Sequence, residues 1–389
     1  GILPGHGVMI DLPKSVKQEK AVAVLSQQGL LQVFGAKGEV LFDGVQVLEK
    51  EHPSIADSIE EISIWPLGSP LGESWGLAAR DSSLFSLHQN SLVKTQLVAP
   101  AEKLSYQRQS VELSGHKVGP MLSDSLVWVA DEQGLKAFET SSLKERFIIK
   151  WTKEFYPTDM AMCGDLDGDG KGEVAVIAND GRLGIFYSQS HNLSVFPSMG
   201  NHTDFNDVHF NLACTDFNRN GRPEAFILGD KGTAWFVNLK TKKRQAMIRN
   251  YDCGIQSENP KIPGEISPIT LADINGDGYP EAIFLGRNNL YAVDSNGVPL
   301  AGFPVLLSKN LPEELLYSTP LAADVNGDGF LEILVPLSTG KVLAVDHQGK
   351  LLKDKWPRSV GFTAYDSIYQ PLSLWGFPGT DKNLLLYGG

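Results

Sequence analysis

The sequence has 389 residues, of which 42% are hydrophobic, so the chain is long enough to bury a sizeable core. Its formal net charge of −12 at pH 7 argues against nucleic acid or an anionic membrane surface as a partner. It has no apolar run of about 18 residues, so we expect no helical membrane insertion. Three cysteines are too few for a disulfide scaffold.

The first part of the chain, residues 1–157, contains short apolar runs separated by turn residues. Runs of this length, rich in β-branched and aromatic residues, favour buried strands. The expected strands are residues 1–13, 21–25, 30–34 and 40–42 in a first unit, 62–65, 75–79 and 83–87 in a second, and 117–122, 126–130 and 135–138 in a third. We interpret residues 99–112 as a polar connection and residues 56–62 as a single helical turn.

A nine-residue pattern then occurs four times. Residues 165–173, 216–224, 273–281 and 324–332 are named here the first, second, third and fourth loops. Side chains with oxygen atoms occupy positions 1, 3, 5 and 9 of each loop, and glycine occupies position 6. Apolar runs lie on both sides of every loop, so each loop is expected to join two strands. The flanking strands and the glutamate at position 9 distinguish the pattern from an EF-hand, which has helices and a glutamate at position 12.

These residue types at this spacing predict calcium sites. Ca²⁺ takes about six to eight oxygen ligands in a flexible cage, whereas Mg²⁺ demands octahedral geometry and retains its waters. Glycine at position 6 permits the sharp turn around the ion, and position 7 can offer a backbone carbonyl, which requires no particular side chain. The expected ligands, in loop order, are Asp165, Asp167, Asp169, Lys171 and Glu173; Asp216, Asn218, Asn220, Arg222 and Glu224; Asp273, Asn275, Asp277, Tyr279 and Glu281; and Asp324, Asn326, Asp328, Phe330 and Glu332.

Turn chemistry alone is the alternative, because Asp, Asn and Gly are common between strands. Four copies in one register favour the ion, so we expect up to four bound calcium ions. The first loop carries four carboxylates, and the third and fourth carry three each. The second loop carries only two, together with Arg219 and Arg222. The second loop, residues 216–224, is therefore expected to bind calcium most weakly.

The repeat spacing predicts the fold. The first aspartates of the loops recur about every 50 residues, a spacing typical of β-propeller blades. The third repeat predicts strands ending at residue 272 and spanning 282–285, 290–293 and 298–305. Residues 239–262 are interpreted as a polar connection, and residues 312–316 as a helical turn. Residues 372–375 and 384–387 begin one more unit.

The expected fold is thus all-β: a β-propeller of four-stranded antiparallel blades, with seven full units and a partial eighth, giving seven or eight blades. We expect a single propeller domain over 1–389. It comprises blades without calcium loops in 1–157, calcium-loop blades in 158–360 and a partial last blade in 361–389. Either the chain is a fragment of a longer protein, which we favour, or an N-terminal segment completes the last blade.

Cys163 and Cys214 occupy the same repeat position, two residues before the first aspartate of a loop. The favoured interpretation is a pair of small buried core residues, and a disulfide is the alternative.

The loops resemble the FG-GAP/VCBS repeats of integrin α-subunit propellers and of many bacterial surface proteins. The resemblance covers residues 158–360 and is carried by the Asp-x-(Asp/Asn)-x-(Asp/Asn)-Gly-x-x-Glu pattern. It implies a β-propeller with calcium loops on one face and an extracytoplasmic setting: extracellular, at the cell surface or periplasmic. It also implies a role in adhesion or assembly with a protein partner. The first three units lack the ligands, so no calcium is expected there.

No catalytic pattern stands out. The sequence has no His-Glu-x-x-His, no Gly-x-Ser-x-Gly and no phosphate-binding glycine loop. His191, His202 and His209 lie close in sequence to Asp204 and Asp207, as a polar surface loop or, alternatively, as a second metal site. We therefore expect a non-catalytic module that binds a protein partner. A glycan-binding module or a polysaccharide lyase-like enzyme is the first alternative, and a structural spacer is the second.

Overall fold

The structure is a computed structural model. It describes residues 7–14, 20–25, 31–34, 40–43, 77–88, 91–99, 105–123, 125–188, 192–196, 209–229, 233–241, 243–249, 267–286, 289–307, 319–336, 341–353, 358–359, 373–376 and 383–386. These residues form strands, turns and irregular segments, and none of them belongs to a helix. Within them, accordingly, there is no helix capable of crossing a membrane.

The chain separates into two compact units. The first comprises Gly1–Lys150 together with Ser373–Gly389, and the second comprises Trp151–Leu372. Our expectation of a single domain with three regions stays a prediction.

The first unit contains three four-stranded antiparallel sheets and a two-stranded sheet, each with its strands in chain order or its reverse. The strands are β1 Gly7–Asp11, β2 Lys20–Leu25, β3 Leu31–Phe34 and β4 Val40–Asp43; β5 Leu77–Arg80, β6 Ser83–His88, β7 Ser91–Val98 and β8 Ser105–Glu112; β9 Lys117–Ser123, β10 Leu126–Asp131, β11 Gly134–Glu139 and β12 Glu145–Lys150; and the hairpin β29 Ser373–Gly376 and β30 Asn383–Leu386.

The second unit contains four further four-stranded antiparallel sheets, again with neighbours paired in chain order. The strands are β13 Pro157–Cys163, β14 Glu173–Ala178, β15 Leu183–Tyr187 and β16 Asn192–Phe196; β17 Phe210–Thr215, β18 Glu224–Gly229, β19 Thr233–Asn238 and β20 Lys243–Arg249; β21 Thr270–Ala272, β22 Glu281–Leu285, β23 Asn289–Val293 and β24 Val305–Leu306; and β25 Leu321–Ala323, β26 Glu332–Pro336, β27 Lys341–Val345 and β28 Arg358–Ser359.

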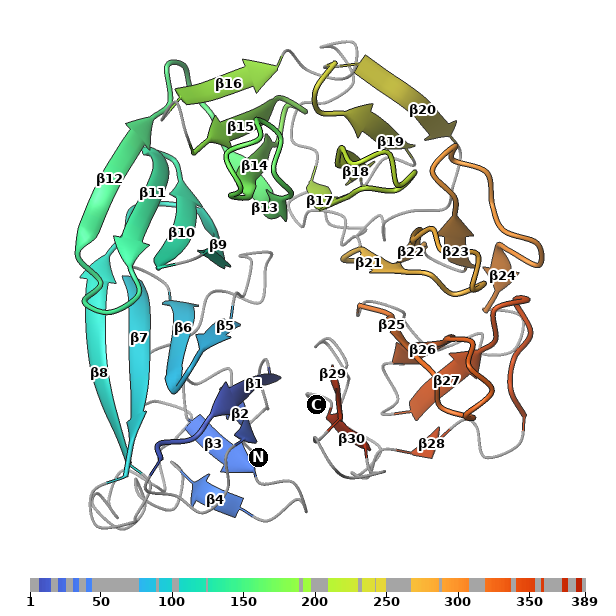
Figure 1. Cartoon of the computed structure of the whole chain (residues 1–389), viewed down its shortest axis with the longest axis horizontal. Helices are drawn as coiled ribbons and strands as arrows, with labels where there is room; N and C mark the ends of the chain where they lie inside the picture. Colours follow the sequence, from blue (N-terminus) through green and yellow to red (C-terminus); the bar gives the residue numbers. More distant parts are fainter. Residues whose placement is uncertain are drawn as a thin grey trace, which may run out of the picture. The chain divides into compact units, whose positions relative to one another are not determined.

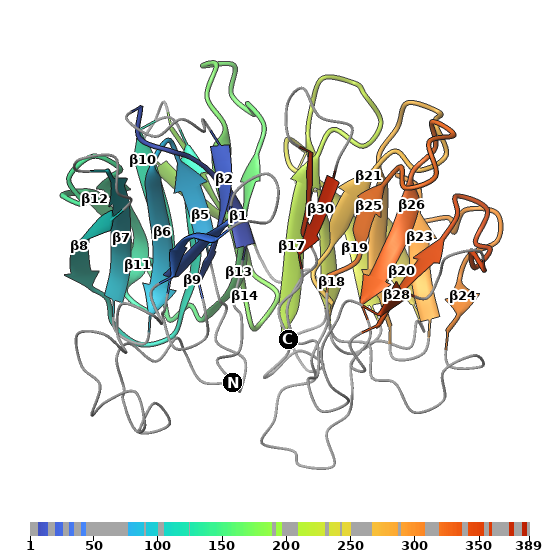
Figure 2. The same ribbon diagram turned by 90° about the horizontal axis from the view of Figure 1, so that it is seen from below.

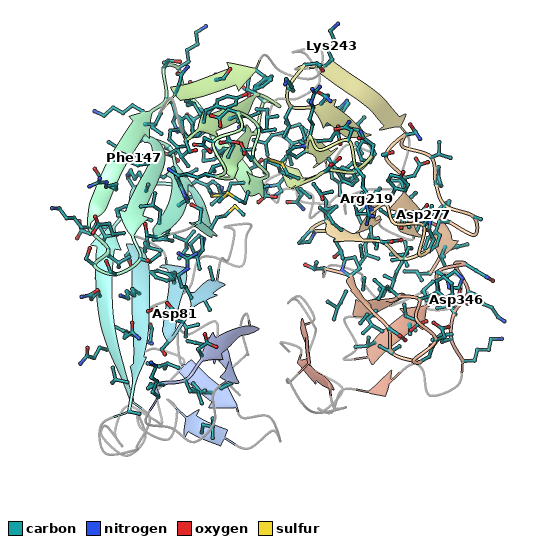
Figure 3. All side chains as sticks on the ribbon, viewed as in Figure 1. Asp81, Phe147, Arg219, Lys243, Asp277 and Asp346 are labelled. Atoms are coloured by element: carbon teal, nitrogen blue, oxygen red, sulfur yellow. A yellow bond between two sulfur atoms is a disulfide. The ribbon has the colours of Figure 1, made fainter. Side chains whose placement is uncertain are left out.

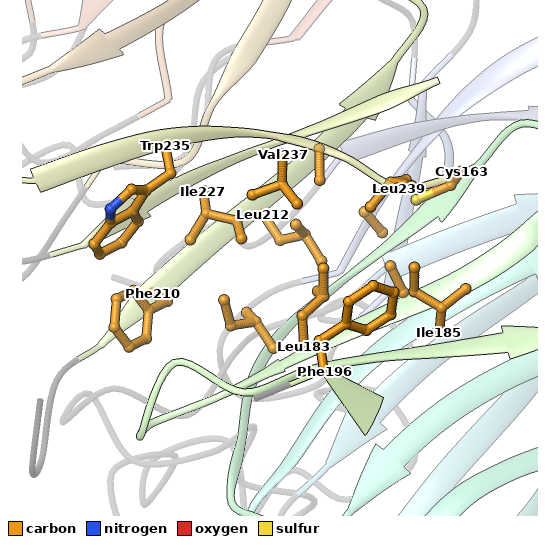
Figure 4. Close-up of a cluster of buried hydrophobic side chains, with 14 residues drawn as sticks. Cys163, Leu183, Ile185, Phe196, Phe210, Leu212, Ile227, Trp235, Val237 and Leu239 are labelled. Atoms are coloured by element: carbon orange, nitrogen blue, oxygen red, sulfur yellow. The ribbon is translucent and has the colours of Figure 1, made fainter. Parts of the chain in front are cut away.

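The hydrophobic core lies between successive sheets. The second strands β14, β18 and β22 are buried along their whole length, and the continuous apolar runs of β18 and β22 face a neighbouring sheet of the second unit on either side. One cluster joins the sheet of β13–β16 to that of β17–β20 and includes Phe196, Phe210 and Trp235 (Figure 4). Similar clusters link the next two pairs of sheets in the second unit and both pairs of four-stranded sheets in the first.

The first strands of successive sheets lie next to one another within each unit (Figure 1; Figure 2). In the first unit β1 lies by β5 and β5 by β9, and in the second β13 lies by β17, β17 by β21 and β21 by β25. Four-stranded meanders that pack face to face with their first strands adjacent are the blades of a β-propeller. The all-β fold and the blade type agree with the prediction. The choice between seven and eight blades stays a prediction.

Three predicted segments differ in the structure. Residues 99–112 and 239–262 were expected to be polar connections, yet they contain the outer strands β8 and β20. An outer strand needs a partner on one edge only and tolerates polar side chains, so its sequence carries no apolar alternation. The predicted strand 298–305 is reduced to Val305–Leu306 at its end. The Asp294 carboxylate accepts the N–H of Asn296 at 2.9 Å and of Val298 at 2.8 Å, which folds the segment into a turn.

Several predictions fall outside the described residues. These are the run 62–65, the single turns at 56–62 and 312–316, and the histidine cluster apart from His209.

Candidate metal loops

The four loops occupy equivalent places in the second unit. Each joins the first strand of a sheet to the second, across β13–β14, β17–β18, β21–β22 and β25–β26. In the second, third and fourth loops the residue before the loop pairs with the glutamate at position 9: Thr215 with Glu224, Ala272 with Glu281 and Ala323 with Glu332. In the first loop the partner of Glu173 is Cys163, two residues before Asp165. The prediction that each loop connects two strands is confirmed.

The aspartate at position 1 closes each loop on itself. Its carboxylate accepts the N–H of the glycine at position 6, at 2.8 Å in the first loop, 2.7 Å in the second, 2.8 Å in the third and 3.0 Å in the fourth. In the first loop Asp165 also accepts the N–H of Gly168 at 2.6 Å. Hydrogen bonds from the backbone, above all from Gly170, lower the pKa of Asp165. The carboxylate of Asp165 is thus held ionised, and the glycine N–H orients the carboxylate at position 1 of every loop.

Positions 4 and 6 both have left-handed backbone. The glycines at position 6 have φ between 78° and 91°, as the sequence pattern predicts. Position 4 has φ of 87° at Gly168, 74° at Gly276 and 82° at Gly327, but the second loop has Arg219 there with φ of 53°. A non-glycine residue in this region costs about 1 kcal/mol. The sequence analysis missed this requirement because Arg219 interrupts the glycine pattern.

The glutamates at position 9 are buried, with exposed fractions of 0% for Glu173 and Glu332 and 1% for Glu224 and Glu281. One oxygen of each accepts the N–H of position 2, at 2.5, 3.3, 3.0 and 2.9 Å in loop order. Burial first, and then repulsion from neighbouring aspartates, raises the pKa of all four glutamates, and the pKa of Glu281 reaches about 7. A bound cation would offset this cost of holding a buried carboxylate.

Four carboxylates converge in the first loop. Ligand oxygens of Asp165, Asp167, Asp169 and Glu173 all lie within 4.8 Å of one another, a grouping able to hold a metal ion. Ser188, which follows β15, donates its hydroxyl to Asp169 at 2.6 Å. An all-oxygen donor set of this kind suits a hard cation such as Ca²⁺.

The third loop contains an acceptor without a donor. The Oδ1 atom of Asp273 is buried, and no described residue gives it a hydrogen bond. A buried carboxylate oxygen without a partner is costly, and a cation within the loop would satisfy it. In the first and third loops, therefore, the oxygen donors suit a hard cation.

The second loop differs from the others. The Asn218 amide donates to Oε1 of Glu224 at 3.1 Å, as the position-3 asparagines of the third and fourth loops do to their glutamates. Among the described residues, only in the second loop does a further amide, that of Asn238, donate to the same oxygen, at 3.4 Å. Asn238 lies outside the loop, directly opposite Glu224 in the β18–β19 pairing. These donors already meet part of the negative charge that an ion would neutralise. Weakest binding at the second loop nevertheless stays a prediction.

Position 7 presents its side chain to solvent. Tyr279 is 46% exposed and Phe330 is 38% exposed, and Lys171 and Arg222 are exposed too. The N–H groups of Lys171, Tyr279 and Phe330 donate to the carboxylate at position 5, each at 2.8 Å. The side chains therefore stay outside the loop, as expected for a position that offers its carbonyl.

A disulfide joins the strands that lead into the first and second loops. Cys163 of β13 and Cys214 of β17 are bonded, with their Cα atoms 5.0 Å apart and 51 residues between them in sequence. The structure thus favours the alternative of a disulfide over two separate core cysteines. The bond ties two neighbouring sheets together at the base of these loops.

One family model and two solved structures are similar to parts of this chain. A family model described as an FG-GAP-like repeat matches residues 273–335, which include the third and fourth loops. No curated protein matches the sequence. The crystal structure of BBS1N in complex with ARL6DN, soaked with lead, is 15% identical, covers 77% of this chain and 84% of its own, and has a TM-score of 0.46. The C-terminal WD40 domain of Sif2 is 12% identical, covers 70% of this chain and 68% of its own, and has a TM-score of 0.47. Residues 273–335 are therefore an FG-GAP-like repeat, carried on four-stranded antiparallel sheets of the β-propeller type.

Proposed function

We propose that the chain is a non-catalytic, calcium-binding propeller that mediates protein–protein interaction in adhesion or assembly at the cell surface. The observation that carries this proposal is the set of four loops at equivalent places in successive sheets, each with a buried glutamate facing aspartates. The ion's role in this proposal is structural. It neutralises carboxylates that otherwise repel one another, and it secures the turn between the first two strands of a blade.

An extracytoplasmic location follows from the same features, whether extracellular, at the cell surface or periplasmic. The disulfide between Cys163 and Cys214 is favoured in oxidising compartments. Loops of modest affinity, with dissociation constants on the order of 10⁻⁴–10⁻³ M, would fill where calcium is abundant. The disulfide and the modest calcium affinity both support an extracytoplasmic location.

A pocket in the second unit favours glycan binding as the second candidate function. The pocket has a volume of about 320 Å³, and Trp151, Lys153, Phe155 and Arg182 are among the residues that line it. Trp151 stacks on Phe155 with ring centres 4.3 Å apart, and the Arg182 guanidinium lies 5.4 Å from the Phe155 ring centre. An aromatic wall with cationic side chains at its edge suits a sugar ring that bears a carboxylate. A polysaccharide lyase-like enzyme would need such a pocket as well.

The proposal is tested by capture of partners. The immobilised chain is exposed to the envelope and secreted fractions of its source, in millimolar calcium and in chelator. The Asp273→Asn/Asp324→Asn variant removes two first-position carboxylates. The Glu112→Gln/Glu145→Gln variant is its control, because it removes two exposed carboxylates far in sequence from the loops.

We expect a protein that binds the wild type and the control in calcium only, and that the loop variant does not retain. Capture of a polysaccharide, lost on Trp151→Ala, would replace the proposal with the glycan function. Capture of nothing in either buffer would overturn both and leave a structural spacer.

A further inference from the structure

Side chains from the two neighbouring loops lie against the third loop. The Arg219 guanidinium carbon, from the second loop, is 5.8 Å from the centre of the Tyr279 ring. Its Nη1 atom lies 3.2 Å from the point where a β-carbon on Gly278 would be. From the fourth loop, a ring carbon of Phe330 lies 3.1 Å from the corresponding point on Gly276. Figure 3 shows Arg219 close to Asp277 of the third loop. Arg219 and Phe330 thus cover both left-handed glycines of this loop.

The other loops lack this arrangement. No atom of the described residues lies within 4 Å of the point where a β-carbon would be on the left-handed glycines of the first and fourth loops. These glycines are Gly168 and Gly170 in the first loop and Gly327 and Gly329 in the fourth. Glycine is needed at those positions for its backbone alone. At Gly276 and Gly278 it also leaves the space that the neighbouring side chains fill. The third loop is the one that the described residues cover from both neighbours.

The two covering side chains are themselves held in place. Arg219 sits in left-handed backbone at φ 53°, next to an Asn220 N–H that donates to Asp216 at 3.0 Å. The Phe330 ring stacks on the His347 ring, with the two ring centres 4.3 Å apart. The backbone of Arg219 is thus held within its own loop, and the ring of Phe330 is held by His347. Each residue can therefore restrict the motion of the third loop, which its side chain touches.

We propose that Arg219 and Phe330 are positioning residues for ion binding at the third loop. Ordering a glycine-containing loop costs conformational entropy at the moment of binding, and a loop that is already held costs less. Arg219 packs on Tyr279, whose carbonyl is an expected ligand, and Phe330 packs on the turn at Gly276. Ion affinity at the third loop therefore depends on side chains that belong to the second and fourth loops. This inference rests on the calcium binding proposed above.

Terbium, a luminescent substitute for calcium, provides a readout for this one loop. Excited tyrosine transfers energy to a nearby Tb³⁺, and Tyr279 is the only tyrosine or tryptophan within the four loops. Tyr187 lies near the first loop, and its pKa is raised by burial and, to a lesser extent, by the charges of Glu173 and Asp167. It therefore adds a second emission signal, from an ion in the first loop. The emission that Tyr279→Phe abolishes defines the third-loop component. Titration of the full chain with Tb³⁺ then gives the affinity of that loop.

Arg219→Ala keeps the left-handed backbone and removes the guanidinium. An exposed cation–π contact is worth about 0.5–1 kcal/mol, so we expect the third-loop affinity for Tb³⁺ to fall about two- to fivefold. Phe330→Ala should lower it in the same direction. Lys240→Ala is the control, because it removes one positive charge from an exposed residue just after β19, in the same sheet as the second loop but outside it. It should leave the affinity unchanged.

The outcomes separate this inference from the function on which it rests. Wild-type affinity in both Arg219→Ala and Phe330→Ala would overturn the positioning role while leaving ion binding intact. An equal loss in Lys240→Ala would overturn it too, because the loss would then not depend on the contact with the third loop. If the wild-type chain gives no Tyr279-dependent emission, ion binding at the third loop fails and this inference fails with it.

Discussion

Asp159 connects two neighbouring sheets through its carboxylate. One oxygen accepts the N–H of Leu212 in β17 at 2.8 Å, and the other accepts the N–H of Met160 at 2.8 Å. Burial raises the pKa of Asp159 to about 7, and these two hydrogen bonds oppose the rise only in part. The side chain is therefore an acid whose charge is disfavoured by folding.

Stability should depend on pH through this group. The folded pKa of about 7 exceeds an unfolded value of about 4, so between them the native state binds a proton that the unfolded state lacks. The free energy of unfolding should thus fall as pH rises from about 4 to about 7. In Asp159→Asn this fall should be shallower. Urea denaturation at constant calcium across that range measures the difference. Parallel curves for the two proteins would contradict it.

The spacing of residues within a loop predicted the aspartates and glutamates that come together, because nine consecutive residues determine their own geometry. Ser188 and Asn238 could not be found in that way. They follow or end a third strand, and they reach the loop carboxylates only through the pairing of the second strand with the third. Asn238 would have been found if the β18–β19 register had been known, since it stands opposite Glu224.

Strands differ in how well they can be predicted from their own sequences. The second strands of the sheets have continuous apolar runs, and the prediction located them well. It missed the third strand β7, in which the polar residues 94–96 interrupt the apolar run. Outer strands such as β8, in which Gln107, Gln109 and Glu112 are exposed, resemble loops in composition. Their pairing is determined by backbone hydrogen bonds to the third strand, which no local pattern records. The rest of the blade is therefore needed to predict its edge.

The disulfide between β13 and β17 should contribute to the stability of the second unit. Closing a loop of 51 residues is worth about 4 kcal/mol on the chain-entropy model. Reduction, or the Cys163→Ser/Cys214→Ser variant, should lower the free energy of unfolding by up to that amount. Denaturation with and without reductant measures the effect, and the double variant should not respond to reductant. Identical stability in all four conditions would contradict the prediction.

At the scale of the whole molecule, the repeat spacing is the main reason that the fold was predictable. A blade cannot bury its faces alone, so repeated units with apolar second strands imply stacked sheets. The hydrophobic clusters between successive sheets are the direct result. The first unit was harder to predict in detail, because its sheets lack the loops that mark the start of each repeat. Only the strand lengths and turns remained as signals.

Calcium should stabilise the two compact units unequally, because all four loops belong to the second. With dissociation constants of about 10⁻⁴–10⁻³ M, 10 mM calcium would add about 1.4–2.7 kcal/mol per filled loop. Hydrogen exchange followed by mass spectrometry should show faster exchange in β13–β28 when chelator replaces calcium, with β5–β12 unchanged. Equal changes in both units, or none in either, would contradict the structural role of the ion.

The hairpin β29–β30 belongs to the same compact unit as β1, and β29 lies next to β1 within it. During translation, therefore, the whole second unit is synthesised after residues 1–150 of the first unit and before residues 373–389 of the first unit. The second unit can fold while translation continues, because its residues emerge as one uninterrupted block. The first unit receives its last hairpin only after residue 386 has been synthesised. A premature stop shortly after residue 372 would leave the second unit whole and the first without its last two strands.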